Sequence, residues 1–355
     1  MQGMVVVATL VVIFAGLRAA EDILLPLLFS VMLAILTAPA VLAMERVRVP
    51  RAIAIVGVVL GVVGVLGTIA VSLGRTIQDF TQQLPGYQER FGQLLWNSES
   101  WLVERGVPRS MLDEIDVSGV LNTGQLMGLV GATLSSVVEI LSNTLLVALL
   151  LTFILFEVTD FPRKLTAIFD DDGRGVSQLT EAAVAVQKYL AIKTVISLAT
   201  GLILGIWTWA MGLDFPFLWG LTAFVLNYIP NIGSILAAIP ATLLAAVLNG
   251  PGNALGVLLG YLVVNVSIGS FMEPRLMGRR LGMSPLVVFL SLIFWGWLWG
   301  PAGMLLSVPL TVMVKIVLEH REDTRWLGIL MGPAREAEEA QVEGAAQESY
   351  FTEQP

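Results

Sequence analysis

The 355-residue chain has no cysteine and a single histidine, His320. Without cysteine it cannot form disulfides, use a thiol nucleophile or bind a metal through sulfur, and one histidine cannot make a histidine cluster. The zinc-protease pattern HExxH, the P-loop pattern and the serine-hydrolase pattern GxSxG are also absent. We therefore expect no enzyme activity, no metal site and no cofactor.

Charged residues are also scarce. Asp, Glu, Lys and Arg make up 14% of the chain, hydrophobic residues make up 56%, and the mean hydropathy is +0.80. This composition is far more apolar than that of a soluble domain and indicates a polytopic protein in a lipid bilayer. The N-terminal MQGMVVVATLVVIF lacks a basic region and a small-residue cleavage site. We expect it to be a retained membrane helix and not a signal peptide.

The net charge of −8 does not point to a basic partner. The tail from Arg335 onward contains one arginine and six glutamates, and so carries −5 of this charge. We expect residues 333–355, which are rich in Glu, Ala and Gln, to form a disordered acidic tail. The remaining Arg and Lys residues are concentrated in short loops, and we expect no nucleic-acid partner.

Apolar segments follow one another along most of the chain, at about 4–17, 23–44, 52–74, 129–157, 192–212, 216–249, 253–271 and 284–319. We predict an all-α polytopic membrane protein with about six full transmembrane helices and two oppositely oriented re-entrant helical hairpins. Its predicted parts are N-terminal membrane helices (1–74), an extramembrane amphipathic helical region (75–128), a fourth membrane helix (129–157), a cytoplasmic amphipathic connector (158–191), two helix-plus-hairpin repeats (192–249 and 253–319) and the tail.

Residues 75–128 are polar but carry apolar residues at helical spacing, among them Ile77, Phe80, Leu84 and Tyr87. We interpret them as an external helical region that serves either as a solvated connector or as a subunit contact or gate. The orientation follows from the Arg and Lys residues, which are enriched in cytoplasmic loops. Their clusters fall on one side if both termini are cytoplasmic, and residues 75–128 then lie outside.

The first hairpin is predicted from FPFLWGLTAFVLNYIPNIGSILAAIPATLLAAVLNG, residues 215–250. The break at Pro-Asn-Ile-Gly leaves two halves of about 14–16 residues, or roughly 21–24 Å of helix each. A full span of the hydrocarbon core takes roughly 30 Å. The segment 284–319 repeats the pattern, since Pro216, Pro230, Gly233 and Pro240 correspond to Pro285, Pro301, Gly303 and Pro309. The two helix-plus-hairpin segments therefore predict an inverted-topology repeat, as in secondary transporters.

The break in the first hairpin supplies candidate solute contacts. Proline lacks an amide hydrogen and clashes with the preceding turn, so Pro230 should free the carbonyl of Leu226 and leave amides at the tip exposed. Two asparagines, four residues apart, add side-chain amides. We predict a substrate site formed by Asn227, Pro230, Asn231, Gly233, Ser234 and Asn265. The alternative is that these amides only satisfy the broken backbone.

The tip of the second hairpin has no polar side chain. We expect its residues Gly300, Pro301 and Gly303 to pack tightly against the first tip near the membrane midplane. A solute path would then run between the two tips.

Glu273 is the candidate for coupling transport to an ion. An acidic residue in a membrane segment is energetically costly and usually functional. The alternative is a structural pairing with Arg275 or Arg279 near the membrane interface. We interpret Lys188 and Lys193, together with Gln187, as interface anchors.

Two stretches carry a family resemblance, PFLWGLTAFVLNYIPNIGSILAAIP and EPRLMGRRLGMSPLVVFLSLIFWGWLWGPAGMLLSVPLTV. They resemble the autoinducer-2 exporter family, also known as the PerM-like permeases. The resemblance is specific in the C-terminal part of the chain and compatible in segment order over residues 1–335. It implies a bacterial inner-membrane transporter that exports autoinducer-2, as several members do, or a sodium(lithium)/proton antiporter, as reported for some relatives. It also implies a homo-oligomer, with a pentamer as one candidate, and points to the motifs LNYIPNIGS and EPRLMG as the site.

Three functions are compatible with these patterns. The first is export of a small polar solute by alternating access, favoured by the amide-rich tip and the scarcity of buried charge. The second is exchange of a monovalent cation for protons, which needs a titratable residue near the midplane, and only Glu273, Glu139 and Glu157 are candidates. The third is a membrane scaffold that binds a partner through residues 75–128. A scaffold has little reason to keep two broken hairpins, so we favour the first.

Overall fold

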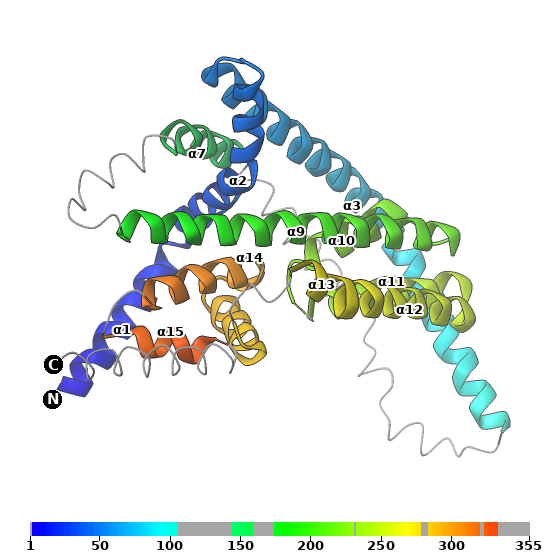
Figure 1. Cartoon of the computed structure of the whole chain (residues 1–355). Helices are drawn as coiled ribbons and strands as arrows, with labels where there is room; N and C mark the ends of the chain where they lie inside the picture. The colour runs from blue at the N-terminus through cyan, green and yellow to red at the C-terminus, as the bar shows by residue number, and fades with distance from the viewer. Residues whose placement is uncertain are drawn as a thin grey trace, which may run out of the picture. The chain divides into compact units, whose positions relative to one another are not determined.

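A computed structural model describes residues 2–105, 144–158, 174–230, 232–277, 283–319 and 323–332 (Figure 1). Every regular element in these ranges is helical, which confirms the predicted all-α class. The helices are α1 (Gln2–Ala19), α2 (Glu21–Arg46), α3 (Arg51–Glu104), α7 (Thr144–Glu157), α9 (Arg174–Ala210), α10 (Pro216–Leu226), α11 (Ile232–Asn249), α12 (Pro251–Val264), the π-helix η1 (Asn265–Met272), α13 (Glu273–Met277), α14 (Pro285–Glu319) and α15 (Arg325–Met331).

Six helical stretches of the described chain are long and apolar enough to cross a membrane. They are Glu21–Arg46, Arg51–Tyr87, Ala183–Ala210, Ile232–Asn249, Pro251–Met272 and Pro285–Glu319. Four of them coincide with predicted full spans, and the other two belong to the predicted hairpins. Several predictions lie wholly or partly outside the described residues. These are the end of the external region (106–128), the first part of the fourth membrane helix (129–143), the start of the connector (159–173), Asn231 and the tail (333–355).

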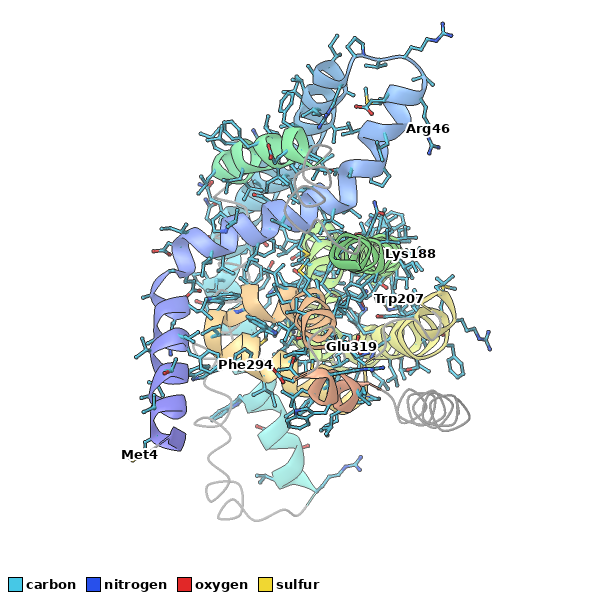
Figure 2. All side chains as sticks on the ribbon, turned by 60° about the vertical axis from the view of Figure 1, so that its left-hand side comes forward. Met4, Arg46, Lys188, Trp207, Phe294 and Glu319 are labelled. Carbon is cyan, nitrogen blue, oxygen red and sulfur yellow. The ribbon has the colours of Figure 1, made fainter. Side chains whose placement is uncertain are left out.

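The first two helices are not joined by a loop, as two separate membrane spans would be. Only Ala20 separates α1 from α2, and its backbone angles (φ −93°, ψ 13°) bend the chain without a connecting segment. Figure 2, in which Met4 and Arg46 mark the two ends, shows this bend. The next helix, α3, runs without interruption for 54 residues, about 80 Å of helix. The predicted boundary at residue 74 is therefore a change of surface chemistry and not a break in the backbone.

The chain divides into two compact units. Unit 1 consists of residues 1–62, 145–194 and 273–355, and unit 2 consists of residues 63–144 and 195–272. The core of unit 1 is formed where α14 packs with α2 and α9, and it includes the buried side chains of Met32, Val186, Tyr189, Leu298 and Trp299.

In unit 1, α14 is folded back on itself. Its backbone leaves the helical region at Trp299 (φ −132°, ψ 25°) and Gly300 (φ 58°, ψ −145°). The indole Nε1 of Trp295 donates a hydrogen bond to Oγ1 of Thr311 at 2.9 Å, although a straight helix would hold these residues about 24 Å apart. The segment 284–319 is therefore a two-armed hairpin, broken at the predicted tip.

In unit 2, α10 and α11 form the other hairpin and pack against each other. Its two ends are tied together, because Nδ2 of Asn249 donates to the carbonyls of Met211 (3.4 Å) and Gly212 (3.2 Å). Nδ2 of Asn253 donates to the same Met211 carbonyl at 2.9 Å. The chain thus leaves this hairpin where it began.

Glycines bring α9 and α10 into close contact in unit 2. A Cβ on Gly201 would lie 2.7 Å from the carbonyl oxygen of Gly220, and a Cβ on Gly205 would lie 3.4 Å from the Gly220 Cα. Gly201 and Gly205 are four residues apart on α9, the spacing that lets membrane helices approach backbone to backbone. This contact sets the position of the first hairpin on α9.

Candidate functional site

The tip of the first hairpin is a turn between Leu226, where α10 ends, and Ile232, where α11 begins. The position of the break at Pro230 is as predicted, but its backbone is more fully bonded than expected. The Leu226 carbonyl is not freed, because it accepts a hydrogen bond from the Ile229 amide at 2.9 Å. The amides of Ile232 and Gly233 donate to the carbonyls of Pro230 (2.6 Å) and Ile229 (3.2 Å). A short turn with its own hydrogen bonds therefore replaces the predicted row of exposed amides.

Gly233 and Gly303 have the same structural role in the two hairpins. A Cβ on Gly233 would lie 1.7 Å from the carbonyl oxygen of Leu226, and one on Gly303 would lie 2.0 Å from that of Trp295. In each hairpin only glycine allows the second arm to close on a carbonyl of the first. The sequence correspondence between these glycines is thus matched by their local geometry.

Asn227 reaches the middle of α9. Its Nδ2 donates to Oγ of Ser197 at 2.9 Å, and Ser197 is fully buried. The bond crosses between helices, so this amide does more than satisfy its own broken backbone. Ser197 was not among the sequence-based candidates, although it lies one helical turn from another polar residue, Lys193, in an apolar helix.

The other predicted contacts of this site are partly buried. Pro230, Ser234 and Asn265 are half-buried, and Gly233 is buried. Asn265 begins the eight-residue π-helix η1, and its Oδ1 lies 3.0 Å from the position of a Cβ on Gly269. Long π-helical stretches are rare and often occur at functional sites. Asn231 lies outside the described residues.

Glu273, in unit 1, pairs with an unexpected partner. Its Oε1 is 2.5 Å from Nζ of Lys193, and the exposed fractions of the two side chains are 20% and 3%. Lys193 was interpreted as an interface anchor, but it is buried against this carboxylate and not presented to the membrane surface. Arg275, one of the two predicted partners, is exposed. A buried ion pair is costly to break, because it leaves one charge without a partner.

The tip of the second hairpin is an aromatic packing site in unit 1. Trp295 and Trp299 stack with ring centroids 5.2 Å apart, and Nε1 of Trp299 donates to the carbonyl of Leu17 in α1 at 3.1 Å. Phe294, labelled in Figure 2, meets Phe14 edge to face at 5.3 Å. Within unit 1, the second tip therefore packs against α1.

Two residues of the predicted external region hold the base of the first hairpin in unit 2. The hydroxyl of Tyr87 lies 2.8 Å from Oδ2 of Asp214. Phe80 is buried against Phe215 and Trp219, with ring centroids 5.9 and 6.3 Å away. Phe215 itself has left-handed backbone angles (φ 58°, ψ 49°), which is strained for a residue other than glycine. The amphipathic stripe of α3 thus clamps a strained turn.

The chain matches the family model described as AI-2E family transporter over residues 7–323. It belongs to this family. It is 39% identical to the AI-2 transport protein TqsA of Escherichia coli strain K12, over 92% of this chain and 94% of that protein. It is 38% identical to the putative transport protein YhhT of the same organism (92% and 93% covered), and 35% identical to a putative transport protein of Haemophilus influenzae (92% and 94% covered).

Membership of the AI-2E family confirms the resemblance predicted from the hairpin motifs. Together with the six stretches able to span a membrane, it makes the chain a multi-pass membrane protein of a transporter family. Among the described residues no three His, Asp or Glu side chains come together as a metal site.

Proposed function

We propose that the protein is a secondary transporter of the bacterial inner membrane that exports a small polar solute, such as autoinducer-2, by alternating access. Both termini are cytoplasmic in this proposal, residues 75–128 are external, and the working unit is a homo-oligomer. The similarity to a relative named AI-2 transport protein supports the choice of solute.

The observation that carries the proposal is the closed base of the first hairpin. Because Asn249 bonds to Met211 and Gly212, both ends of the segment 216–249 lie together, as they would in a hairpin that enters and leaves the membrane on one side. The tip then lies within the membrane, where a broken backbone is tolerated only against protein or a water-filled path. The matching glycines, Gly233 and Gly303, support an inverted repeat of 192–249 and 253–319.

The solute site in this proposal is the tip of the first hairpin. Asn227 provides a side-chain amide next to buried Ser197, and Pro230, Asn231, Gly233, Ser234 and Asn265 complete the predicted set. The apolar second tip, Gly300, Pro301 and Gly303, is a packing site in this proposal and not a solute contact. Neither tip carries a charged side chain, which favours a neutral solute.

Replacing Asn227 by Ala tests this assignment. We expect cells that produce the variant to lose export of autoinducer-2, while the variant reaches the membrane in wild-type amounts and elutes from a sizing column like the wild type. Export at the wild-type rate would remove Asn227 from the site.

Cation/proton antiport is the second candidate, and the buried pair of Lys193 and Glu273 is the observation that favours it. Glu273 would be the coupling residue, alternately binding a proton or sodium and the lysine ammonium. Inverted membrane vesicles should then show a sodium-driven change of internal pH that Glu273→Gln abolishes. An equal response in the variant and the wild type would reject this role for Glu273.

A further inference from the structure

Two hydroxyl groups on α9 in unit 2 depart from the usual behaviour of serine and threonine in apolar helices. Many serine and threonine hydroxyls in the described helices donate to the carbonyl one turn earlier, as Thr37 does to Leu33 (2.6 Å) and Thr208 to Leu204 (2.9 Å). Ser197 instead accepts from Asn227. The hydroxyl of Thr200 is buried and has no partner among the residues that the structure describes.

A third hydroxyl in the same unit is also without a partner. Tyr261 on α12 is 3% exposed, and within the described ranges its hydroxyl makes no hydrogen bond. Burying a hydroxyl without a partner destabilises a fold, so such groups call for an explanation. In the described part of the chain, four buried side-chain polar atoms have no hydrogen-bond partner, and two of them are the hydroxyl oxygens of Thr200 and Tyr261.

The packing of α9 on α12 brings these hydroxyls to one level. Nε1 of Trp207 on α9, labelled in Figure 2, donates to the Gly256 carbonyl on α12 at 3.3 Å. Four residues further along the chain, just after the end of α9, the Met211 carbonyl accepts from Asn253, which lies three residues before Gly256 on α12. The helices are therefore antiparallel, as Figure 1 also shows.

This register defines what lies opposite Thr200. Because Thr200 precedes Trp207 by seven residues, it lies level with the stretch about seven residues beyond Gly256, between Tyr261 and Asn265. The π-helix η1 begins at that Asn265. On a neighbouring face, α9 meets the first hairpin, where Asn227 bonds to Ser197, one turn before Thr200.

We infer that the hydroxyls of Thr200 and Tyr261 are solute contacts that determine specificity, completing with Ser197 the site begun by Asn227 and Asn265. The inference rests on the proposed transport function. All five side chains are neutral and offer hydroxyl or amide groups, so the site takes an uncharged solute with several hydroxyl or carbonyl oxygens. The solute supplies the hydrogen-bond partners that Thr200 and Tyr261 lack. A charged solute would instead need an opposite charge at the site.

The test uses two variants that remove a hydroxyl and keep the shape, Thr200→Val and Tyr261→Phe. Each should raise the KM for autoinducer-2 in proteoliposomes about three- to tenfold, the value of one neutral hydrogen bond. Because each hydroxyl is unpaired in the fold, the melting temperature should stay constant or rise. Thr208→Val is the matched control, since that hydroxyl is bonded to its own helix, and its KM should not change. An unchanged KM in both test variants, or a KM raised equally by the control, would overturn the inference.

If the wild type does not transport autoinducer-2, that result contradicts only the proposed solute and not the site. A second measurement then tests the site without autoinducer-2. The chain has no cysteine, so a single introduced thiol is labelled without background. Thr200→Cys should react with a small water-soluble methanethiosulfonate, and Thr208→Cys should not. Failure to label Thr200→Cys from either side of the membrane would show that no aqueous solute reaches it, which overturns the inference whatever the solute is.

Discussion

Removing either partner of the Lys193–Glu273 pair leaves the other charge buried, and the exposures of the two side chains predict an asymmetric cost. Breaking a buried ion pair costs about 3–5 kcal/mol. Glu273→Gln leaves the lysine ammonium without a partner, and that side chain is only 3% exposed. Lys193→Met leaves the carboxylate without a partner, and that side chain is 20% exposed. We expect Glu273→Gln to lie near the upper end of that range and Lys193→Met near the lower end.

The double variant separates the pair from its surroundings. With both charges removed, no unpaired charge remains. The free energy of unfolding of Lys193→Met/Glu273→Gln should therefore lie within about 1 kcal/mol of the wild-type value. The assay is SDS-induced unfolding in mixed micelles, followed by tryptophan fluorescence and arranged as a double-mutant cycle. Lys188→Met, an exposed lysine five residues earlier on α9, is the control and should change stability by less than about 0.5 kcal/mol.

Two results would refute the reasoning about this pair. One is additive effects of the two substitutions, since a contact as close as 2.5 Å must give a coupling energy. The other is a Glu273→Gln variant no less stable than Lys188→Met, which would mean that water reaches the lysine.

Three further substitutions test the helix contacts. Gly201→Ala should lower stability by about 1–3 kcal/mol, as overpacking does, because its Cβ would meet a carbonyl at 2.7 Å. The control Gly67→Ala has nothing within 4 Å of its Cβ, so in the same unfolding assay it should leave stability unchanged or raise it by up to about 1 kcal/mol. Gly300→Ala should cost about 1–3 kcal/mol through backbone strain alone, since φ is 58° and no atom opposes the Cβ; a wild-type midpoint would contradict the broken helix. Tyr87→Phe removes the bond to Asp214 and should speed amide hydrogen exchange in residues 213–219, and unchanged exchange would argue against the clamp.

The breaks in the helices could be predicted from the sequence because their causes are local. Proline removes a helix hydrogen bond and glycine tolerates a turn, so the close pairs Pro230 with Gly233 and Gly300 with Pro301 marked both tips without knowledge of any neighbour. A lone proline was not enough, because Pro26 and Pro85 lie inside continuous helices. The predicted correspondence of Gly233 and Gly303 agrees with the structure for the same reason, because each glycine meets a carbonyl in its own hairpin. The all-α class followed from composition and hydrophobic segment length alone.

The partners of the polar groups could not be predicted, because they depend on how distant helices pack. Glu273 has arginines close in sequence, yet it pairs with Lys193, eighty residues away. The prediction of a free Leu226 carbonyl was wrong because the turn after a broken helix can form its own bond, here from Ile229. A stripe of polar residues at helical spacing on α9 was the one signal that could have pointed to Ser197.

The central claim, that this protein transports a small polar solute, is tested most directly by flux through the purified protein. Liposomes loaded with autoinducer-2 should release it faster when their membrane contains the wild-type protein than when it contains no protein. Liposomes with the Asn227→Ala variant should release it at the rate of the protein-free liposomes. Equal release with and without the wild-type protein would contradict autoinducer-2 as the solute. Release by Asn227→Ala at the wild-type rate would contradict the hairpin tip as its path.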